Sequence, residues 1–340
     1  MRGLGSRRTA RTLTLAVVLS GMVMAGAACS SGSESLTVYS GRTADLVGPL
    51  FTRFEEQTGI DVKVRYGDSA EVAGAVLEEG DNPRADVLIV QDAGNIGQVG
   101  KANLLAPLDQ AAVDKVPAQF RSPSDQWVGL SGRARVVVYD SSKLRESDLP
   151  ASIDGFTDPR WKDRLAWAPT NGSFQAFVTA FRVMKGEAAA EAWLKGIEAN
   201  NPKAFPNNVA IVEAVGRGEV DAGFVNHYYL HRLKAEGKAG TAANKHYGAG
   251  DPGGLVNVSA AGILKGTEHE ADAKRLVEFL LSDESQRYFA EQTYEMPVVP
   301  SVRPNPDLPE ITALARPEVE LAKLDDAKGT IDLITRLGIL

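Results

Sequence analysis

The segment that decides the fold runs from Leu36 to Val90 and reads LTVYSGRTADLVGPLFTRFEEQTGIDVKVRYGDSAEVAGAVLEEGDNPRADVLIV. Three short apolar runs in it have the composition of strands: 36–40, 61–66 and 87–90. Two intervening segments repeat apolar residues at helical spacing and end at glycine, which predicts helices. Because proline inside a helix removes a backbone donor, we expect the first helix to begin near Pro49. Strands that alternate with helices predict a doubly wound α/β sheet.

The rest of the chain continues the alternation. Further strands are predicted at 135–139, 165–168, 222–225 and 254–264, and further helices at 174 onward, 188–199, 209–215, 271–281 and 283–292. Segments 132–139 and 254–264 are long enough to cross between two sheets, so we expect two doubly wound lobes joined by a two-crossover hinge. The predicted N-terminal lobe is 36–135 plus 259–309, and the C-terminal lobe is 136–258 plus 310–340. A ligand cleft is expected between them.

The N-terminus has the pattern of an export signal. Basic residues precede an apolar stretch from Leu13 to Ala28, which is too short for a stable membrane span. Small residues lead into Cys29, the single cysteine of the chain, as in a bacterial lipobox. We therefore predict a signal peptide at 1–28, lipidation of Cys29 and a flexible tether at 29–35. The alternative is an ordinary cleaved signal with an incidental cysteine.

Charge and motifs exclude several classes of function. The formal net charge is −7, and loss of the arginine-rich signal would make the protein more acidic, so nucleic acid is a poor partner. Neither a serine-hydrolase elbow, a zinc-protease helix motif nor a P-loop occurs. His227 and His231 have the spacing of two metal ligands on a helix, although we expect a solvent-facing pair. The glycine-rich run 248–254 could bind an anion, but a turn before a strand is favoured.

Asn226-His227-Tyr228-Tyr229 follows directly after a predicted strand. Adjacent tyrosines are ordinarily packing residues. Ferric iron, however, is a hard cation that favours anionic oxygen donors, and phenolate is such a donor. At a strand-to-helix corner both rings can face a cleft, whereas on a regular strand or helix they would point apart.

The chain resembles a known family through several motifs in a fixed order. These are Val-Tyr-Ser-Gly-Arg at 38–42, Ala-Asp-Val at 85–87, Leu-Leu-Ala-Pro-Leu at 104–108, Leu-Ser-Gly-Arg-Ala-Arg-Val-Val-Val-Tyr-Asp at 130–140, Asn-His-Tyr-Tyr at 226–229 and Asp-Pro-Gly at 251–253. From Leu36 to about Pro300 it is similar to the ferric-ion-binding proteins of bacterial iron importers, a branch of the type II periplasmic binding fold.

This resemblance implies a ligand set. Tyr228 and Tyr229 would supply phenolate ligands to Fe³⁺, and a synergistic anion, carbonate or phosphate, would complete the iron shell. The positions that match the family's anion pocket are Asn171, Gly172, Ser173, Asn208 and Asn226. Backbone N–H groups at a helix N-terminus near Ser173 would suit an anion. For the three asparagines, turn and cap chemistry is the alternative.

The chain also departs from the family pattern in the first lobe. Thr43 stands where some members have a histidine, Gln91 (with Asp92 beside it) where some have a carboxylate, and Trp167 where others have a third tyrosine. Arg42 and Arg133 suggest a carbonate-type anion held by guanidinium groups, although an ion pair is the alternative for both. The possible further contributors are Tyr39 and Tyr66.

Three functions are therefore compared. The first is a non-enzymatic carrier of iron and an anion, monomeric, lipid-anchored at the outer face of the cell membrane and docking on an ABC permease. The second is a carrier of another small solute, such as an oxyanion or a polyamine. The third is a secreted metal-dependent enzyme that uses His227 and His231.

Replacement of Cys29 by serine tests the predicted anchor. We expect Cys29→Ser to leave the protein unprocessed or released into the medium, with iron binding intact, because serine cannot carry the thioether-linked lipid. Fractionation of cells that express either form measures this. Retention of processed Cys29→Ser protein in the membrane would place the anchor elsewhere.

Overall fold

The computed structural model describes residues 35–314 and 319–340. The predicted signal peptide, Cys29 and nearly all of the tether lie outside the described residues. Within these two ranges, no helix has the length and apolar character needed to cross a membrane.

The first five elements form the predicted alternating unit. They are β1 (Leu36–Ser40), α1 (Ala44–Thr58), β2 (Val62–Tyr66), α2 (Ser69–Glu79) and β3 (Val87–Val90). β1 lies in the middle and pairs in parallel with both β2 and β3. Parallel neighbours require crossover connections, and α1 and α2 provide them. The strand–helix order predicted from the sequence is confirmed.

The expectation that the first helix begins near Pro49 is wrong. α1 begins at Ala44, after Thr43 in an extended conformation, and contains Pro49. Proline removes only one backbone donor of the helix, and its side chain is exposed. The apolar face of α1 is buried along its length, which offsets the lost hydrogen bond. This face consists of Leu46, Val47, Leu50, Phe51 and Phe54.

The remaining predicted elements are present, although the strand predicted at 135–139 begins already at Val128, and several elements that were not predicted accompany them. The helices are α3 (Ala93–Lys101), α4 (Gln110–Val113), α5 (Gly172–Lys185), α6 (Glu187–Ala199), α7 (Asn208–Gly216), α8 (Tyr228–Ala235), α9 (Glu270–Leu280), α10 (Asp283–Tyr288) and α11 (Ala327–Arg336). The strands are β4 (Val128–Asp140), β5 (Leu165–Trp167), β6 (Lys203–Ala204), β7 (Ala222–Asn226), β8 (Ala242–Lys245), β9 (Val256–Ile263) and β10 (Met296–Pro297).

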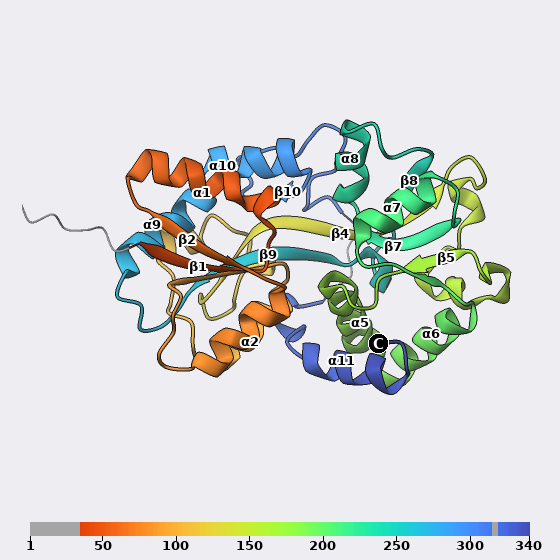
Figure 1. Ribbon diagram of the computed structural model, residues 1–340, viewed down its shortest axis with the longest axis horizontal. Helices are drawn as coiled ribbons and strands as arrows, with labels where there is room; N and C mark the ends of the chain where they lie inside the picture. Colours follow the sequence, from red (N-terminus) through yellow and green to blue (C-terminus); the bar gives the residue numbers. More distant parts are fainter. Residues whose placement is uncertain (1–34, 315–318) are drawn as a thin grey trace, which may run out of the picture. The chain divides into compact units, whose positions relative to one another are not determined.

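The strands of the described residues form one mixed sheet in the order β2-β1-β3-β9-β4-β7-β5-β6, with β8 and β10 also paired to β4. β4 is the longest strand and changes partner along its length. Val128–Ala134 pairs antiparallel with β9, and Arg135–Tyr139 pairs antiparallel with β7. β4 and β9 therefore run side by side between β1–β3 and the strands β5 and β7 (Figure 1).

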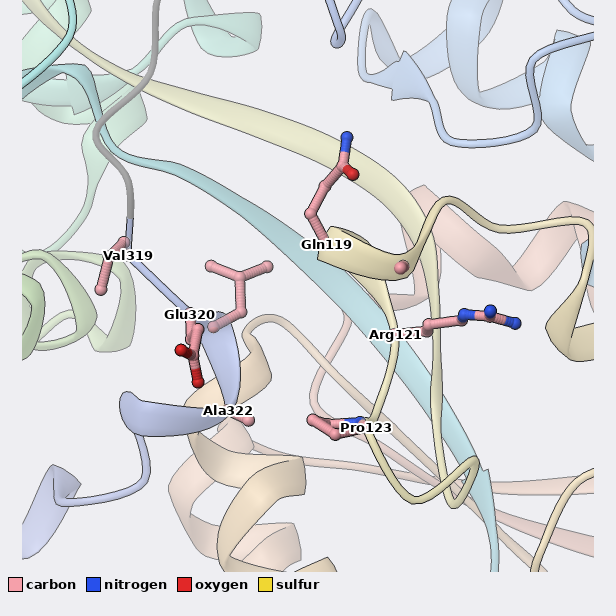
Figure 2. Close-up of a pocket in the computed structure, with 8 residues that line it drawn as sticks. Gln119, Arg121, Pro123, Val319, Glu320 and Ala322 are labelled. Carbon is pink, nitrogen blue, oxygen red and sulfur yellow. The ribbon is translucent and has the colours of Figure 1, made fainter.

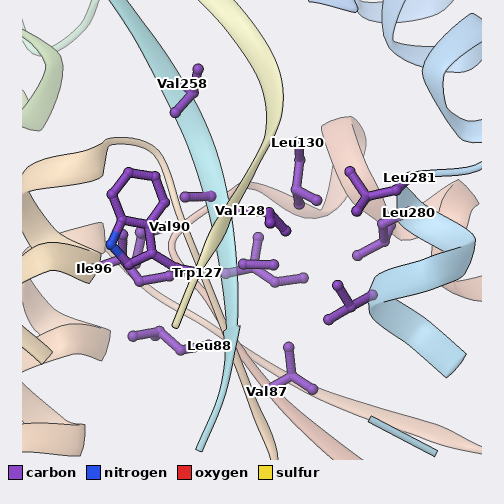
Figure 3. Packing of buried hydrophobic residues seen from close by; sticks show 14 of the residues in the cluster. Val87, Leu88, Val90, Ile96, Trp127, Val128, Leu130, Val258, Leu280 and Leu281 are labelled. Carbon is purple, nitrogen blue, oxygen red and sulfur yellow. The ribbon is translucent and has the colours of Figure 1, made fainter. Parts of the chain in front are cut away.

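Buried apolar side chains form separate clusters along this sheet. The largest contains β1, β3, β9 and the first half of β4, and Figure 3 shows Leu88 of β3 and Val128 of β4 among its members, with β9 between these two strands. Two smaller clusters cover the second half of β4 with β5 and β7. The C-terminal segment divides between them. Ile311, Leu321 and Leu324 pack with the largest cluster, and Leu333 and Ile334 pack with a smaller one.

Candidate metal and anion site

The two tyrosines lie at a strand-to-helix corner. β7 ends at Asn226, His227 follows, and α8 begins at Tyr228. The rings of Tyr228 and Tyr229 stack with centroids 4.1 Å apart and an interplanar angle of 30°. The corner thus lets the rings of two consecutive residues lie on the same side.

The Tyr228 hydroxyl is buried without a hydrogen-bond partner among the residues that the structure describes. A polar group left in this state ordinarily costs about 1–3 kcal/mol. Burial raises the pKa of Tyr229 well above that of a free phenol, and the adjacent Tyr228 raises it further, whereas Arg42 and Arg133 act in the opposite direction. Two phenols beside two guanidinium groups are suited to bind a cation that displaces the phenol protons.

Arg42 follows β1 and is almost completely buried. Its Nη2 forms an ion pair with the Glu295 carboxylate, which raises the pKa of Arg42 against the effect of burial. The Nε and Nη1 groups of Arg42 have no hydrogen-bond partner within the described part of the chain. Arg42 therefore has N–H donors available for a ligand. The ion pair considered as an alternative from the sequence is present, but it involves only Nη2 of the guanidinium.

Arg133 and Arg135 project from β4. Arg133 Nη1 donates to Gln91 Oε1 at 3.4 Å, and Arg135 Nη1 donates to Asn226 Oδ1 at 3.1 Å. Burial lowers the pKa of Arg135 to about 9, and burial and Arg42 lower the pKa of Arg133. The sequence interpretation missed Arg135. Its position two residues after Arg133 places both on the same face of a strand and could have revealed it.

The predicted anion-pocket residues form one hydrogen-bond network. Asn171 caps the N-terminus of α5, which begins at Gly172, and its Oδ1 accepts from the Ser173 backbone N–H at 3.1 Å. The same oxygen accepts from Asn208 Nδ2 at 3.1 Å, and Asn208 Oδ1 accepts from the Asn226 backbone N–H at 3.3 Å. The cap chemistry considered as an alternative is present at Asn171, and the same side chain connects Ser173 to Asn208, which in turn accepts from Asn226.

Two neighbouring cavities share Gln91. The larger, of ≈ 380 Å³, is lined by Gly41, Arg42, Thr43, Asp45, Leu46, Asp68, Gln91, Asn171, Pro206, Asn207, Val209, Tyr229 and Arg232. The smaller is lined by Gln91, Asp92, Arg133, Arg135, Ser173, Ala176, Asn226, Leu255 and Asn257. Predicted residues from distant parts of the sequence thus line two adjacent polar cavities, although Tyr228, Gly172 and Asn208 line neither of them in the described part of the chain.

Tyr39 and Tyr66 line neither of these cavities in the described part of the chain. The Tyr39 hydroxyl donates to Glu79 Oε1 at 2.8 Å, and Tyr66 is 40% exposed at the end of β2. Trp167 is buried and packs edge-on against Phe174 with ring centroids 5.8 Å apart. The position expected for a third tyrosine therefore contributes apolar packing.

His227 is fully buried, so the expectation of a solvent-facing histidine pair is wrong. Its Nδ1 accepts from the Ala134 backbone N–H at 3.1 Å, which leaves the proton on Nε2 to donate to the Tyr294 carbonyl at 3.1 Å. Burial lowers the pKa of His227 well below that of free imidazole. Because both ring nitrogens are used, His227 is not available to a metal. The residues described contain no group of three or more side chains of the His, Cys, Asp and Glu types arranged for a metal ion.

The glycine-rich run forms a turn, as favoured from the sequence. Pro252–Gly254 is a short 3₁₀ helix that leads into β9. The Asp251 carboxylate accepts from the backbone N–H groups of Gly253 at 2.7 Å and Ile153 at 3.1 Å. These contacts occupy both of its oxygens and explain the turn.

A further pocket of ≈ 370 Å³ contains none of the predicted site residues (Figure 2). Its lining includes Gln119, Arg121 and Glu320. The polar residues singled out by sequence therefore converge on the Gln91 region rather than on this pocket.

The sheet topology and polar cleft define a type II periplasmic binding fold. Iron-bound HitA from Pseudomonas aeruginosa matches with a TM-score of 0.85 at 34% identity, covering 89% of this chain and 99% of that chain. A Trichodesmium protein in complex with iron and citrate matches with a TM-score of 0.76 at 28% identity, covering 89% and 99%. The chain belongs to the family of bacterial extracellular solute-binding proteins, whose sequence profile matches residues 82–320.

Curated relatives cover nearly the whole chain. The major ferric iron-binding protein of Neisseria meningitidis serogroup B is 35% identical over 322 residues, which is 92% of this chain and 95% of the relative. The Fe(3+)-binding periplasmic protein of Serratia marcescens is 32% identical over 332 residues, covering 96% and 97%.

The unpartnered Tyr228 hydroxyl predicts an unusual stability difference. In the metal-free protein, Tyr228→Phe should leave the free energy of unfolding unchanged or raise it, because no hydrogen bond to the described residues is lost. Tyr247→Phe is the matched control, since its buried hydroxyl donates to the Pro150 carbonyl at 3.2 Å, and it should cost about 1 kcal/mol. Urea unfolding measures both. An equal loss in the two variants would mean that the Tyr228 hydroxyl is paired in solution.

Proposed function

We propose that this chain is an extracytoplasmic ferric-iron-binding lipoprotein that delivers iron(III) with a synergistic anion to an ABC permease. The observation that carries the proposal is the stacked tyrosine pair at the end of β7, next to buried guanidinium groups. The proposal includes lipidation at Cys29 and a monomeric carrier without catalytic activity. Relatives named as ferric iron-binding proteins support the choice of cargo.

Phenolate chemistry explains why this pair suits ferric iron. A phenol ordinarily keeps its proton at neutral pH. A trivalent cation displaces that proton, because its charge favours the ionised oxygen. Arg42 and Arg133 act in the same direction on Tyr229, while burial acts against it. In this proposal Tyr229 keeps its proton until iron enters, and both Tyr228 and Tyr229 then become its ligands.

Buried charge supports the anion. Arg42, Arg133 and Arg135 are all buried. Near them, Glu295 pairs with Arg42, and burial raises the pKa of Asp92, which weakens its compensation of the arginines. Buried cations without partners are unfavourable, so an excess of guanidinium favours an anionic occupant. Ferric iron with two phenolates and a dianion carries a net negative charge that would offset this excess. Carbonate or phosphate has the required charge and acceptor oxygens.

The proposed lobes give the site a means of closure. With the N-terminal lobe at 36–135 plus 259–309, and the C-terminal lobe at 136–258 plus 310–340, the larger cavity has walls from both, although Ile311, Leu321 and Leu324 pack with the cluster of the N-terminal lobe. Arg42 and Gln91 would come from the first lobe, and Asn171 and Tyr229 from the second. Asp45 and Arg232, which also line this cavity, form an ion pair at 2.9 Å. We propose that β4 and β9 bend when iron enters or leaves.

One alternative remains specific enough to test. The buried arginines would also suit an oxyanion carrier that takes no metal, whereas they would repel a polyamine. An enzyme that uses His227 and His231 is disfavoured because both nitrogens of His227 are hydrogen-bonded.

Colour distinguishes the iron carrier from the oxyanion carrier. The iron-loaded mature protein should be purple-red, because charge transfer from phenolate to ferric iron absorbs visible light. Tyr228→Phe or Tyr229→Phe should bleach or shift the band, and Tyr66→Phe, whose ring lies outside both cavities, should leave it unchanged. Visible spectra of the loaded variants measure this. A full-strength band in the Tyr228→Phe, Tyr229→Phe double variant would rule out these ligands.

Iron affinity should fall with falling pH. The pKa of Tyr229 is raised, so its proton is present across the physiological range and must leave when iron binds. For each proton released on binding, the apparent affinity for iron falls about tenfold per unit fall in pH. Two phenolate ligands therefore predict a fall of about a hundredfold per pH unit. Competition with a chelator of known protonation measures the slope. Tyr229→Phe should reduce it by about one proton, and a slope of zero in the wild type would contradict phenolate ligation.

A further inference from the structure

Glu295 is a buried carboxylate that the sequence did not single out. It is fully buried and follows a π-helical turn at Phe289–Thr293. Tyr294, immediately before it, has a φ of 56°, in the left-handed region that non-glycine residues rarely adopt. Local strain of this kind often accompanies functional positions. The backbone therefore holds Glu295 in place at some conformational cost.

Both oxygens of this carboxylate are engaged, and they connect different parts of the fold. Oε1 accepts from Arg42 Nη2 in the buried ion pair. Oε2 accepts from Ser131 Oγ at 2.6 Å, and Ser131 Oγ lies 2.7 Å from Ser259 Oγ. Ser131 belongs to β4 and Ser259 to β9, so the two central strands fix the carboxylate. Glu295 in turn fixes one corner of Arg42.

The remaining corners of Arg42 are free. Its Nε and Nη1 are buried and have no partner in the two described ranges. Arg42 lines the larger cavity together with Tyr229, and its charge is felt by both tyrosines. The same carboxylate also interacts electrostatically with Arg133. A negative charge at Glu295 therefore cancels part of the positive potential that Arg42 and Arg133 would present to an anion.

We propose that Glu295 is a positioning residue that sets the anion affinity and charge preference of the cleft through Arg42. It holds the guanidinium so that its free N–H groups remain available, and it limits the positive charge that the anion meets. This inference rests on the proposed function, because it assumes that the cleft binds a small oxyanion with iron. Without this carboxylate the site would hold anions more tightly, and dianions more than monoanions, which would oppose release of the cargo.

The variant Glu295→Gln removes the charge and keeps the shape. Its amide oxygen can still accept from Arg42, and its NH₂ group can donate to Ser131. Calorimetric titration of the iron-free mature protein with inorganic phosphate and with bicarbonate, at fixed mildly alkaline pH and ionic strength, measures the effect. We expect affinity to increase on the order of tenfold per unit of anion charge, so phosphate should gain more than bicarbonate.

Two further variants separate charge from packing. Glu284→Gln removes the same charge from an exposed position beside Arg53 and should change neither affinity appreciably, because solvent screens it. In an Arg42→Gln background, Glu295→Gln should give little further gain, since the carboxylate then has no Arg42 guanidinium to position. An equal gain with and without Arg42 would overturn the assignment of Glu295 to Arg42.

The opposite outcome is a structural role. If Glu295→Gln unfolds cooperatively like wild type but binds phosphate equally or more weakly, the proposal is wrong. If it fails to fold, Glu295→Asp, which keeps the charge but withdraws it from Arg42, should show a smaller gain with the same preference for phosphate, and a loss would overturn the proposal. If the wild type shows the iron colour but Glu295→Gln shows no gain in anion affinity, this inference alone is contradicted. Wild type that binds neither iron nor anion contradicts the proposed function as well.

Discussion

The antiparallel pairing of β4 with β9 is the contact on which the rest of the fold depends. β9 joins β3 to β4, and β4 continues beyond β9 to pair with β7 and β8. The large apolar cluster includes residues of both strands, and the smaller clusters form where β4 extends past β9. The polar residues of the candidate site lie where β4 changes partner, since Arg133 pairs with Asn257 of β9 and Arg135 pairs with Asn226 of β7.

This arrangement explains how a site assembles from remote segments. Strand ends bring Arg42 and Gln91 to the cleft, and a helix N-terminus brings Asn171. The β7–α8 corner brings Tyr229, with the ring of Tyr228 stacked on it. Each of these residues lies in a helix or strand or directly beside one. Their positions therefore do not depend on the ordering of long loops. The cost is an accumulation of buried guanidinium groups with unpaired N–H donors among the described residues, which a purely structural core would avoid.

Periodicity sufficed for most of the fold and for part of the site. Apolar spacing located β1 through β3 because each packs on local neighbours. The expectation at Pro49 failed because burial of the α1 face outweighed one lost hydrogen bond.

For the site, the tyrosine corner followed from a strand that ends just before Tyr228. Arg135 was within reach through strand alternation. Glu295 was not, since its partner Arg42 is 253 residues away and no local pattern marks a buried carboxylate. His227 was misjudged because helical spacing indicates a shared face but not which side is buried.

The division of the C-terminal segment has a mechanical consequence. Ile311, Leu321 and Leu324 pack with the large cluster, and α11 packs with a smaller one. The chain between them is thus a third covalent link beside β4 and β9. Arg182 of α5 fastens its far end by an ion pair to Asp326 at 2.7 Å. Any rotation of one cluster against the other must bend three connections together: β4, β9 and the segment that leads into α11. This third connection therefore restricts both the axis and the amplitude of such a rotation.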